Sequence, residues 1–296
     1  LDIIAEVCDD VERGYGTYHG QFASCLYEIA TLQLELGVLS DAERTLLQIS
    51  ERMYYTNPGI NDFNLDVLLA LADVYRQQGR YQECNNVLSS VTELALIAGE
   101  TDSLIAAKNY QGTTFSVLGE LDKSEEVLTD VWEYGLRHWS DNPELMGSFY
   151  NAQLSLADVY RRRGKLVDAE LLLEDAQQQL NRLYGEHFVP SIIATNSLGQ
   201  LYEQIGLYDA AEPLLKQAVT NLEYVFGIEH LDTIAARNNL ALLYESQGNF
   251  REAEPLYRTS ISTYEELLGP EHPDTIAIKN NLAFLYMLME EYERST

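Results

Sequence analysis

A phrase of nineteen residues occurs twice near the end of the chain. Residues 226–244 read FGIEHLDTIAARNNLALLY, and residues 268–286 read LGPEHPDTIAIKNNLAFLY. The two copies are 42 residues apart and align without a gap. A catalytic site is needed once, whereas a repeated phrase of this length indicates a structural unit that is used again. Internal repetition therefore constrains the fold before any single motif is interpreted.

Glycines extend this repetition over most of the chain. They recur with spacings of 42, 40, 45, 42 and 42 residues, at Gly37, Gly79, Gly119, Gly164, Gly206 and Gly248. A small residue stands seven positions before and five positions after each glycine, beginning with Ala30 and Ala42. Helices that cross closely need small side chains at the contact. The pattern predicts a helix A and a helix B around each glycine, each with one apolar stripe.

A second glycine, followed by a histidine, recurs after four predicted B helices, at 15–19, at 184–188 (YGEHF), at 226–230 and at 268–272 (LGPEH). The glycine is suited to end a helix, and the Asp-Thr pairs after it, at 232–233 and 274–275, are predicted to cap the next helix A. All five histidines lie in or beside such joints: His19, His138, His187, His230 and His272. Joints spaced about 20 Å apart along a stack of helix pairs cannot assemble one catalytic site. We therefore expect these histidines to be structural.

The charge limits the partners of the chain. Its 47 acidic residues exceed its 19 basic residues, which gives a formal net charge of −28. A polyanion repels phosphate backbones and anionic lipid surfaces, so we expect neither nucleic acid nor a membrane surface as a partner. No apolar run reaches the roughly 18 residues that span a bilayer.

Cys8, Cys25 and Cys84 form no CxxC pair, so the sequence predicts neither a metal site nor a disulfide framework. We expect free thiols in a reducing compartment and a cytoplasmic location. The first residues lack both an initiating Met and the features of a signal peptide, so we expect the sequence to be a piece of a longer chain.

The repeated unit consists of a helix, a turn, a second helix and a joint, with small residues at the helix contact. This unit resembles the tetratricopeptide repeat. The signature core stands as LADVY at 71–75 and 156–160, LGQLY at 198–202, LALLY at 240–244 and LAFLY at 282–286. The 42-residue period, the phrase NNLAxLY and the joint LGxEHPDT are similar to the subfamily of the kinesin light chains. This resemblance implies an all-α, right-handed superhelical solenoid whose inner wall is formed by the A helices.

The glycine register also predicts the domain organisation. We expect a partial preceding repeat at 1–22 and a half repeat at 276–296. Between them we expect six repeats, at 23–64, 65–104, 105–149, 150–191, 192–233 and 234–275.

Asparagines recur on the predicted inner wall. In the kinesin light chains, groove asparagines of the NNLA helix contact cargo peptides, and the resemblance implies this role for Asn196, Asn238, Asn239, Asn280 and Asn281. Asn109 matches this position by register only. An amide offers a donor and an acceptor, so a row of amides can pair with the backbone of an extended peptide. The alternative is that these polar residues merely solvate an exposed face.

Arginines are the second set of candidate peptide contacts. Arg76 and Arg161 each follow an aspartate by three residues, and Arg162 stands beside Arg161. Such i,i+3 pairs can lock each other, or the arginines can receive carboxylates of a partner. Further along the wall stand Gln200, Glu203, Gln204 and Glu245, so the sign of the partner's charge stays open.

No motif for catalysis, phosphate binding or a cofactor occurs in the sequence. We therefore expect a protein that is not an enzyme and that binds a protein or peptide segment in a concave groove, as an adaptor or scaffold. The alternative is a sensing or autoinhibitory arm of a larger signalling protein, such as a nucleotide-driven receptor. Apolar residues of the last helix, Leu282 to Leu288, also raise the prospect of self-association through terminal repeats.

Overall fold

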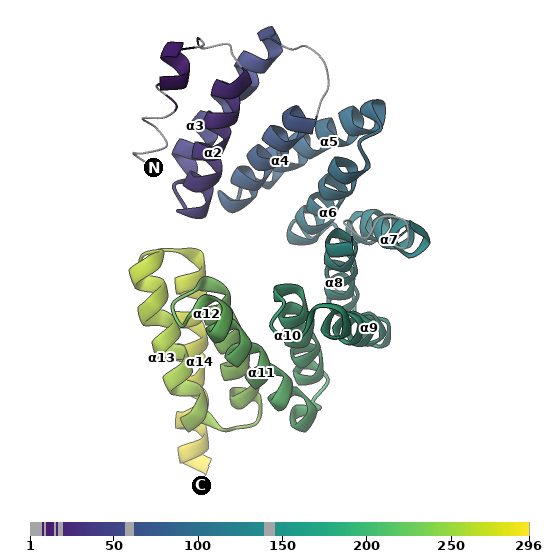
Figure 1. The fold of residues 1–296 in the computed structure, drawn as a ribbon. Helices are drawn as coiled ribbons and strands as arrows, with labels where there is room; N and C mark the ends of the chain where they lie inside the picture. The colour runs from purple at the N-terminus through teal and green to yellow at the C-terminus, as the bar shows by residue number, and fades with distance from the viewer. Residues whose placement is uncertain are drawn as a thin grey trace. The chain divides into compact units, whose positions relative to one another are not determined.

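The computed structural model describes residues 8, 10–14, 16, 20–56, 62–138 and 146–295, and this part of the chain contains helices and no strand (Figure 1). The even-numbered helices correspond to the predicted A helices and the odd-numbered helices to the B helices. Their bounds are α2 Gly20–Glu35, α3 Leu39–Thr56, α4 Asp62–Gln77, α5 Tyr81–Ala98, α6 Thr101–Val117, α7 Leu121–His138, α8 Met146–Arg162, α9 Leu166–Tyr184, α10 Val189–Gln204, α11 Tyr208–Phe226, α12 Leu231–Ser246, α13 Phe250–Leu267 and α14 Pro273–Ser295.

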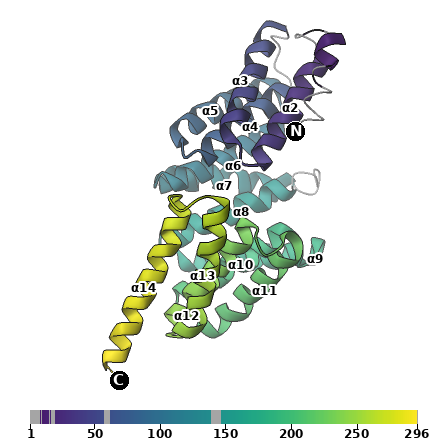
Figure 2. The same cartoon turned by 90° about the vertical axis from the view of Figure 1, so that its left-hand side faces the viewer.

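The chain divides into two compact units within α8, and each is described by itself. Unit 1 comprises residues 1–155, and unit 2 comprises residues 156–296. In both units helices that follow each other in sequence pack together, as Figure 2 shows for α12 and α13. Neighbouring A helices also touch, at α4 with α6 in unit 1 and at α10 with α12 in unit 2. Consecutive packed helix pairs confirm the predicted all-α solenoid class.

The turn inside each helix pair contains the predicted glycine. At all six of these glycines φ lies between 71° and 80°, a backbone conformation that residues with a Cβ rarely adopt. At Gly206 the turn is closed by hydrogen bonds from the amide of Gly206 to the carbonyl of Glu203 and from Leu207 to Tyr202. The recurring glycines therefore lie in turns, as predicted. They can be identified from the sequence because few other residues adopt the positive φ that these turns require.

Small residues lie where helix A crosses helix B, as the sequence predicts. A Cβ added to Gly199 would stand 2.8 Å from Leu215, which is too close for any real contact. Gly112 stands in the same relation to Leu128. In both pairs the small residue is seven positions before the turn glycine and the leucine nine positions after it. These two positions therefore set the distance at which helix A crosses helix B. In the other repeats the small position is occupied by alanine.

The joints of unit 2 differ in one respect from the prediction. The helix cap is the histidine: Nδ1 of His230 accepts a hydrogen bond from the amide of Asp232 at 3.3 Å. The threonine points the other way, because the Thr233 hydroxyl donates to the carbonyl of Gly227 at 2.9 Å. The next joint repeats both bonds, at His272 and Thr275. The Asp-Thr pair is therefore not the cap that the sequence suggested, and threonine instead closes the preceding helix end.

A basic side chain braces each of the same two joints. The guanidinium of Arg237 donates to Glu223 Oε1 at 2.7 Å and to the carbonyl of Ile228 at 2.9 Å. Forty-two residues later Lys279 forms an ion pair with Glu265 at 2.7 Å and donates to the carbonyl of Pro270 at 3.3 Å. These contacts tie helix B, the joint and the next helix A together.

Two other histidines also have structural contacts. His138 stacks on Tyr134, with ring centroids 4.2 Å apart, and His187 packs against Tyr224. His19 and residues 139–145 of the predicted long joint lie outside the described residues.

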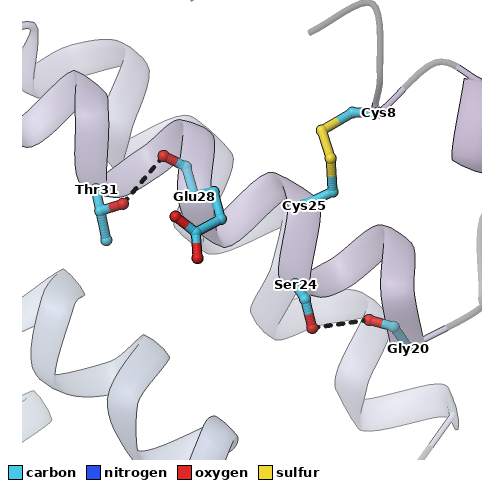
Figure 3. Close-up of a disulfide and its surroundings, with 6 residues drawn as sticks. All are labelled: Cys8, Gly20, Ser24, Cys25, Glu28 and Thr31. Atoms are coloured by element: carbon cyan, nitrogen blue, oxygen red, sulfur yellow. Dashed lines mark hydrogen bonds between the residues drawn. A yellow bond between two sulfur atoms is a disulfide. The ribbon is translucent and has the colours of Figure 1, made fainter. Parts of the chain in front are cut away.

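The cysteines contradict the expectation of three free thiols. Cys8 and Cys25 form a disulfide, with Cα atoms 5.6 Å apart (Figure 3). It ties the segment before α2 to the middle of that helix. Cys84 is the free cysteine of the described chain and is buried. Burial raises the pKa of its thiol, which disfavours the reactive thiolate.

Candidate functional site

One stripe of each A helix in unit 2 stays open to solvent. On α12 it consists of positions spaced three or four apart, which a helix places on one face. Residues between these positions, such as Ile234 and Leu243, are fully buried. We define the A-helix face by the equivalent exposed or half-buried positions of the three helices: Val189, Ile193, Asn196, Gln200 and Glu203 on α10, Leu231, Ala235, Asn238, Leu242 and Glu245 on α12, and Ala277, Asn280, Phe284 and Met287 on α14.

The asparagines of this face and their neighbours Asn239 and Asn281 form a ladder across the three helices. The amide nitrogen of Asn239 donates to Asn196 Oδ1 on the neighbouring helix, at 3.3 Å. One repeat later Asn281 donates to Asn238 Oδ1 at the same distance. Each bond joins residues 43 apart, so the 42-residue period places one amide beside the next. Asn280 is exposed at the end of the ladder.

The ladder does not exhaust the amides. A carboxamide has two N–H donors and two acceptor lone pairs, and each bond uses one donor of one residue and one lone pair of the other. All members except Asn280 are half-buried, so they are not sealed inside the packing. The row can therefore still offer donors and acceptors to a backbone that lies along it.

Asn109 is not part of this ladder. It lies on α6 in unit 1, where its amide nitrogen donates to the carbonyl of Ser148 at 2.8 Å. Its Oδ1 is buried and has no hydrogen-bond partner among the described residues. Asn109 therefore lies on an A helix, as its register predicts, but its contacts differ from those of the asparagines in unit 2.

The candidate arginines engage the aspartates that precede them. Arg76 binds Asp73 at 2.5 Å in unit 1, and Arg161 binds Asp158 at 2.6 Å in unit 2. Arg161 also donates to Gln204 Oε1 on α10, at 3.0 Å. Both local pairs foreseen in the sequence are therefore present. Arg162 is exposed near the end of α8.

The acidic end of the face is formed by Glu203 and Glu245. Glu203 Oε1 accepts a hydrogen bond from the hydroxyl of Ser246 on the next A helix, at 2.6 Å. Glu245 Oε2 accepts one from the hydroxyl of Tyr257, at 3.0 Å. Burial raises the pKa of Glu245, the tyrosine bond opposes that shift, and the charge of Glu203 adds to it. The two carboxylates thus lie close enough to repel.

Sequence reasoning missed the apolar members of the face. Ile193 is 44% exposed and Leu231 40% exposed, although both are large aliphatic residues. Phe284 and Met287, 50% and 60% exposed, were interpreted as terminal residues without a covering helix. They occupy the register positions of Leu242 and Glu245 one repeat earlier, so the 42-residue register could have placed them on the face. Leu285, from the same stretch, is fully buried.

The described residues contain no cluster of His, Cys, Asp and Glu that could hold a metal ion. None of the described helices combines the length and the apolar character needed to cross a membrane.

Comparison with known families agrees with the architecture. The model of the tetratricopeptide repeat matches residues 148–224, 191–266 and 232–295, which together span 148–295, half of the chain. The chain belongs to the tetratricopeptide repeat family. Proteins with tetratricopeptide repeats typically act as non-catalytic interaction modules, and the family signal is concentrated on the helices that form the A-helix face.

Solved structures extend the likeness of the tetratricopeptide fold over more of the chain. A putative kinesin light chain from Podosopora anserina, with nearly identical repeats, is 22% identical over 68% of this chain and 95% of its own, with a TM-score of 0.53. NprR, solved with its cognate peptide NprX, is 14% identical over 99% of this chain and 79% of its own, at 0.64.

A third similar structure is that of a signal transduction ATPase with a tetratricopeptide repeat sensor, from Pyrococcus horikoshii. It is 14% identical over 97% of this chain but only 41% of its own, with a TM-score of 0.62. At these identities the likeness shows the fold alone. No curated protein matches the chain.

Proposed function

We propose that unit 2 binds an extended protein or peptide segment along its A-helix face and that the chain serves as an adaptor or scaffold without catalytic activity. The observation that carries this proposal is the asparagine ladder, because it repeats the same amide pair across three consecutive A helices. A row of amides at one register is suited to pair with a backbone whatever its side chains.

The dimensions of the face support an extended ligand. Neighbouring A helices of unit 2 contact each other directly, and packed helices lie about 10 Å apart, so successive A helices are closer than the spacing of about 20 Å per helix pair expected from the sequence. Three A helices therefore span about 20 Å between the outer axes. An extended segment advances about 3.3 Å per residue, so about six residues cross from one outer axis to the other. Exposed apolar residues on either side of the amides would anchor side chains of the same segment.

The assignment of site residues follows from this geometry. Asn196, Asn238, Asn239, Asn280 and Asn281 are proposed as ligand contacts, and Arg161 with Arg162 as flanking contacts at the α8 edge. Asn109 and Arg76 lie on A helices of unit 1 and are proposed as contacts within that unit. We also propose the repeat boundaries that the glycine register predicts and a cytoplasmic location.

A sensing arm of a larger signalling protein is the second candidate. The specific observation in its favour is the likeness to the signal transduction ATPase, whose tetratricopeptide repeats are described as a sensor. In that case the same face would hold a ligand or a segment of the larger protein. Both candidates use the A-helix face, so one experiment on the face serves both.

Binding by this face is tested with a ligand selected for the purpose. A phage-displayed library of random peptides of about ten residues, long enough to cross the face, would be selected against the whole chain. We expect Asn238→Ala with Asn280→Ala to weaken the selected peptide about tenfold in fluorescence anisotropy, because backbone partners are lost. The control is Asn86→Ala, an exposed asparagine on helix B α5. Equal affinity of all three proteins, at unchanged melting temperature, would remove the A-helix face as the site.

A further inference from the structure

The residue types of the A-helix face change along each helix. At the C-terminal ends of α10 and α12 the face residue is a glutamate. Glu203 on α10 and Glu245 on α12 occupy the same register position, 42 residues apart. The hydroxyl of Ser246, the residue after Glu245, donates to Glu203 at 2.6 Å, so the ends of the two helices are in direct contact. The two carboxylates are therefore side by side on one surface.

These carboxylates are not neutralised by the chain's own cations. The ion pairs that the structure describes on α9 to α14 use other acidic residues, and the two groups on the face accept hydrogen bonds from Ser246 and Tyr257 instead. The acidic partners of those ion pairs are Glu212, Glu223, Glu254 and Glu265. Arg161, one register earlier, is held by Asp158 and Gln204. Glu203 and Glu245 are thus both half-buried carboxylates without a cationic partner among the described ion pairs.

Apolar side chains lie directly beside the acidic pair. The neighbouring row of the face runs from Gln200 through Leu242 to Phe284, and Phe284 is 50% exposed. The acidic row itself ends in Met287, which is 60% exposed. An aromatic and a thioether side chain left in water together form a patch suited to another apolar group. An acidic subsite and an apolar subsite therefore lie next to each other on the part of the face formed by α10, α12 and α14.

We propose that the A-helix face selects a segment of a partner protein that carries a Lys or Arg side chain close to a large apolar side chain. The cation would lie against Glu203 and Glu245, and the apolar side chain on Leu242 and Phe284. This inference rests on the proposed function, since it names the ligand chemistry of the same face.

Two physical arguments favour a basic ligand over an acidic one. A cation placed against two neighbouring carboxylates removes their mutual repulsion and gains charge-assisted hydrogen bonds from both. The formal net charge of −28 also attracts a cationic segment from a distance and repels an anionic one. An acidic segment would have to approach the same two carboxylates without any compensating cation on α10, α12 or α14 at that position.

The spacing between the two ligand side chains follows from the helix separation. The acidic pair lies between α10 and α12, and the apolar pair lies between α12 and α14, so their centres are about one helix spacing, 10 Å, apart. In an extended segment this distance corresponds to about three residues. The basic and the apolar side chain should therefore be two to four residues apart.

The test uses three fluorescein-labelled peptides of about ten residues, a length that crosses the face. The first carries Arg and Phe three residues apart in a background of Ser, Gly and Thr. The second has Glu in place of Arg, and the third has Ala in place of Phe. We expect the whole chain to bind the first peptide at least about tenfold more tightly than either of the others, at moderate salt.

Variants locate this selectivity. Glu203→Gln with Glu245→Gln keeps both hydrogen-bond acceptors and should abolish the roughly tenfold preference for Arg over Glu. Phe284→Ala should abolish the preference for Phe over Ala. The matched control is Glu229→Gln with Glu266→Gln, which removes the same charge from exposed positions that are not members of the A-helix face and should retain the selectivity.

The outcomes separate this inference from the proposed function. If all three peptides bind equally and Asn238→Ala with Asn280→Ala weakens each of them, the face binds peptides but the inferred selectivity is wrong. If the control variant loses the preference for Arg as fully as Glu203→Gln with Glu245→Gln does, the preference comes from the overall charge and the inference is again wrong. If none of the peptides binds and the asparagine variants have no effect on any selected ligand, both proposals are overturned.

Discussion

At the scale of single residues, a buried charge needs a full set of partners. The side chain of Arg237 is only 10% exposed, and its guanidinium donates to Glu223 and to the carbonyl of Ile228. Removing such a group leaves the carbonyl of Ile228 without this donor and the partly exposed carboxylate of Glu223 without its cation. The same kind of ion pair at the surface contributes little, because water and salt screen it.

This contrast gives a prediction. Arg237→Met should lower the free energy of unfolding by about 2 kcal/mol, since the side chain that makes these hydrogen bonds is only 10% exposed. Arg137→Met should lower it by less than about 0.5 kcal/mol, because the Arg137 side chain is 65% exposed in its pair with Glu133. Urea unfolding followed by circular dichroism measures both. Equal losses would show that the brace at the joint adds nothing beyond a surface ion pair.

At the scale of helices, packing is decided at the crossing points. Ala211 of α11 is fully buried five residues after its turn glycine, while its neighbour Ala210 is exposed. Protein interiors are close-packed, so extra methylenes at such a crossing push the two helices apart. An exposed alanine on the same helix has no such constraint.

Ala211→Leu should therefore lower the free energy of unfolding by about 2 kcal/mol through overpacking. Ala210→Leu, one residue away on the same helix, should change it by less than about 0.5 kcal/mol, because Leu and Ala both favour helix and the site is open. Chemical denaturation of the two variants beside the parent chain tests the pair. A larger loss for Ala210→Leu would place the crossing on the wrong side of α11.

Much of this helical level could be predicted from the sequence, because the determinants are local and repeat. Turn glycines and small crossing residues recur at fixed distances, so each copy supports the others. Contacts between copies were harder to predict. The Asn196–Asn239 bond depends on how neighbouring A helices rotate, and the caps by His230 and His272 compete with plausible caps by the residues that follow. Nothing in the spacing of Cys8 and Cys25 sets their distance in space.

At the scale of the whole molecule, charge opposes compactness. The excess of 47 acidic over 19 basic residues leaves many carboxylates without a counter-charge. Like charges on a compact chain repel one another, and the unfolded chain relieves this repulsion by expanding. Salt screens charges separated by more than about 10 Å at 0.1 M, so it acts mainly on this long-range term.

Raising the salt concentration from about 0.02 M to about 0.3 M should therefore raise the melting temperature by a few degrees. Calorimetry or circular dichroism in NaCl measures the shift, and KCl serves as the control, because screening depends on ionic strength rather than on the ion. A fall in melting temperature would mean that attractive ion pairs outweigh the repulsion.

The joint contacts bear on how a chain of this kind can gain or lose whole repeats. The bonds made by His230, Thr233 and Arg237 recur 42 residues later at His272, Thr275 and Lys279, and each involves only adjacent helices. If a 42-residue block were duplicated or lost in the gene, the new junction would therefore present matching ends. Recombination between such copies would lengthen or shorten the proposed binding surface in single steps without a new kind of interface.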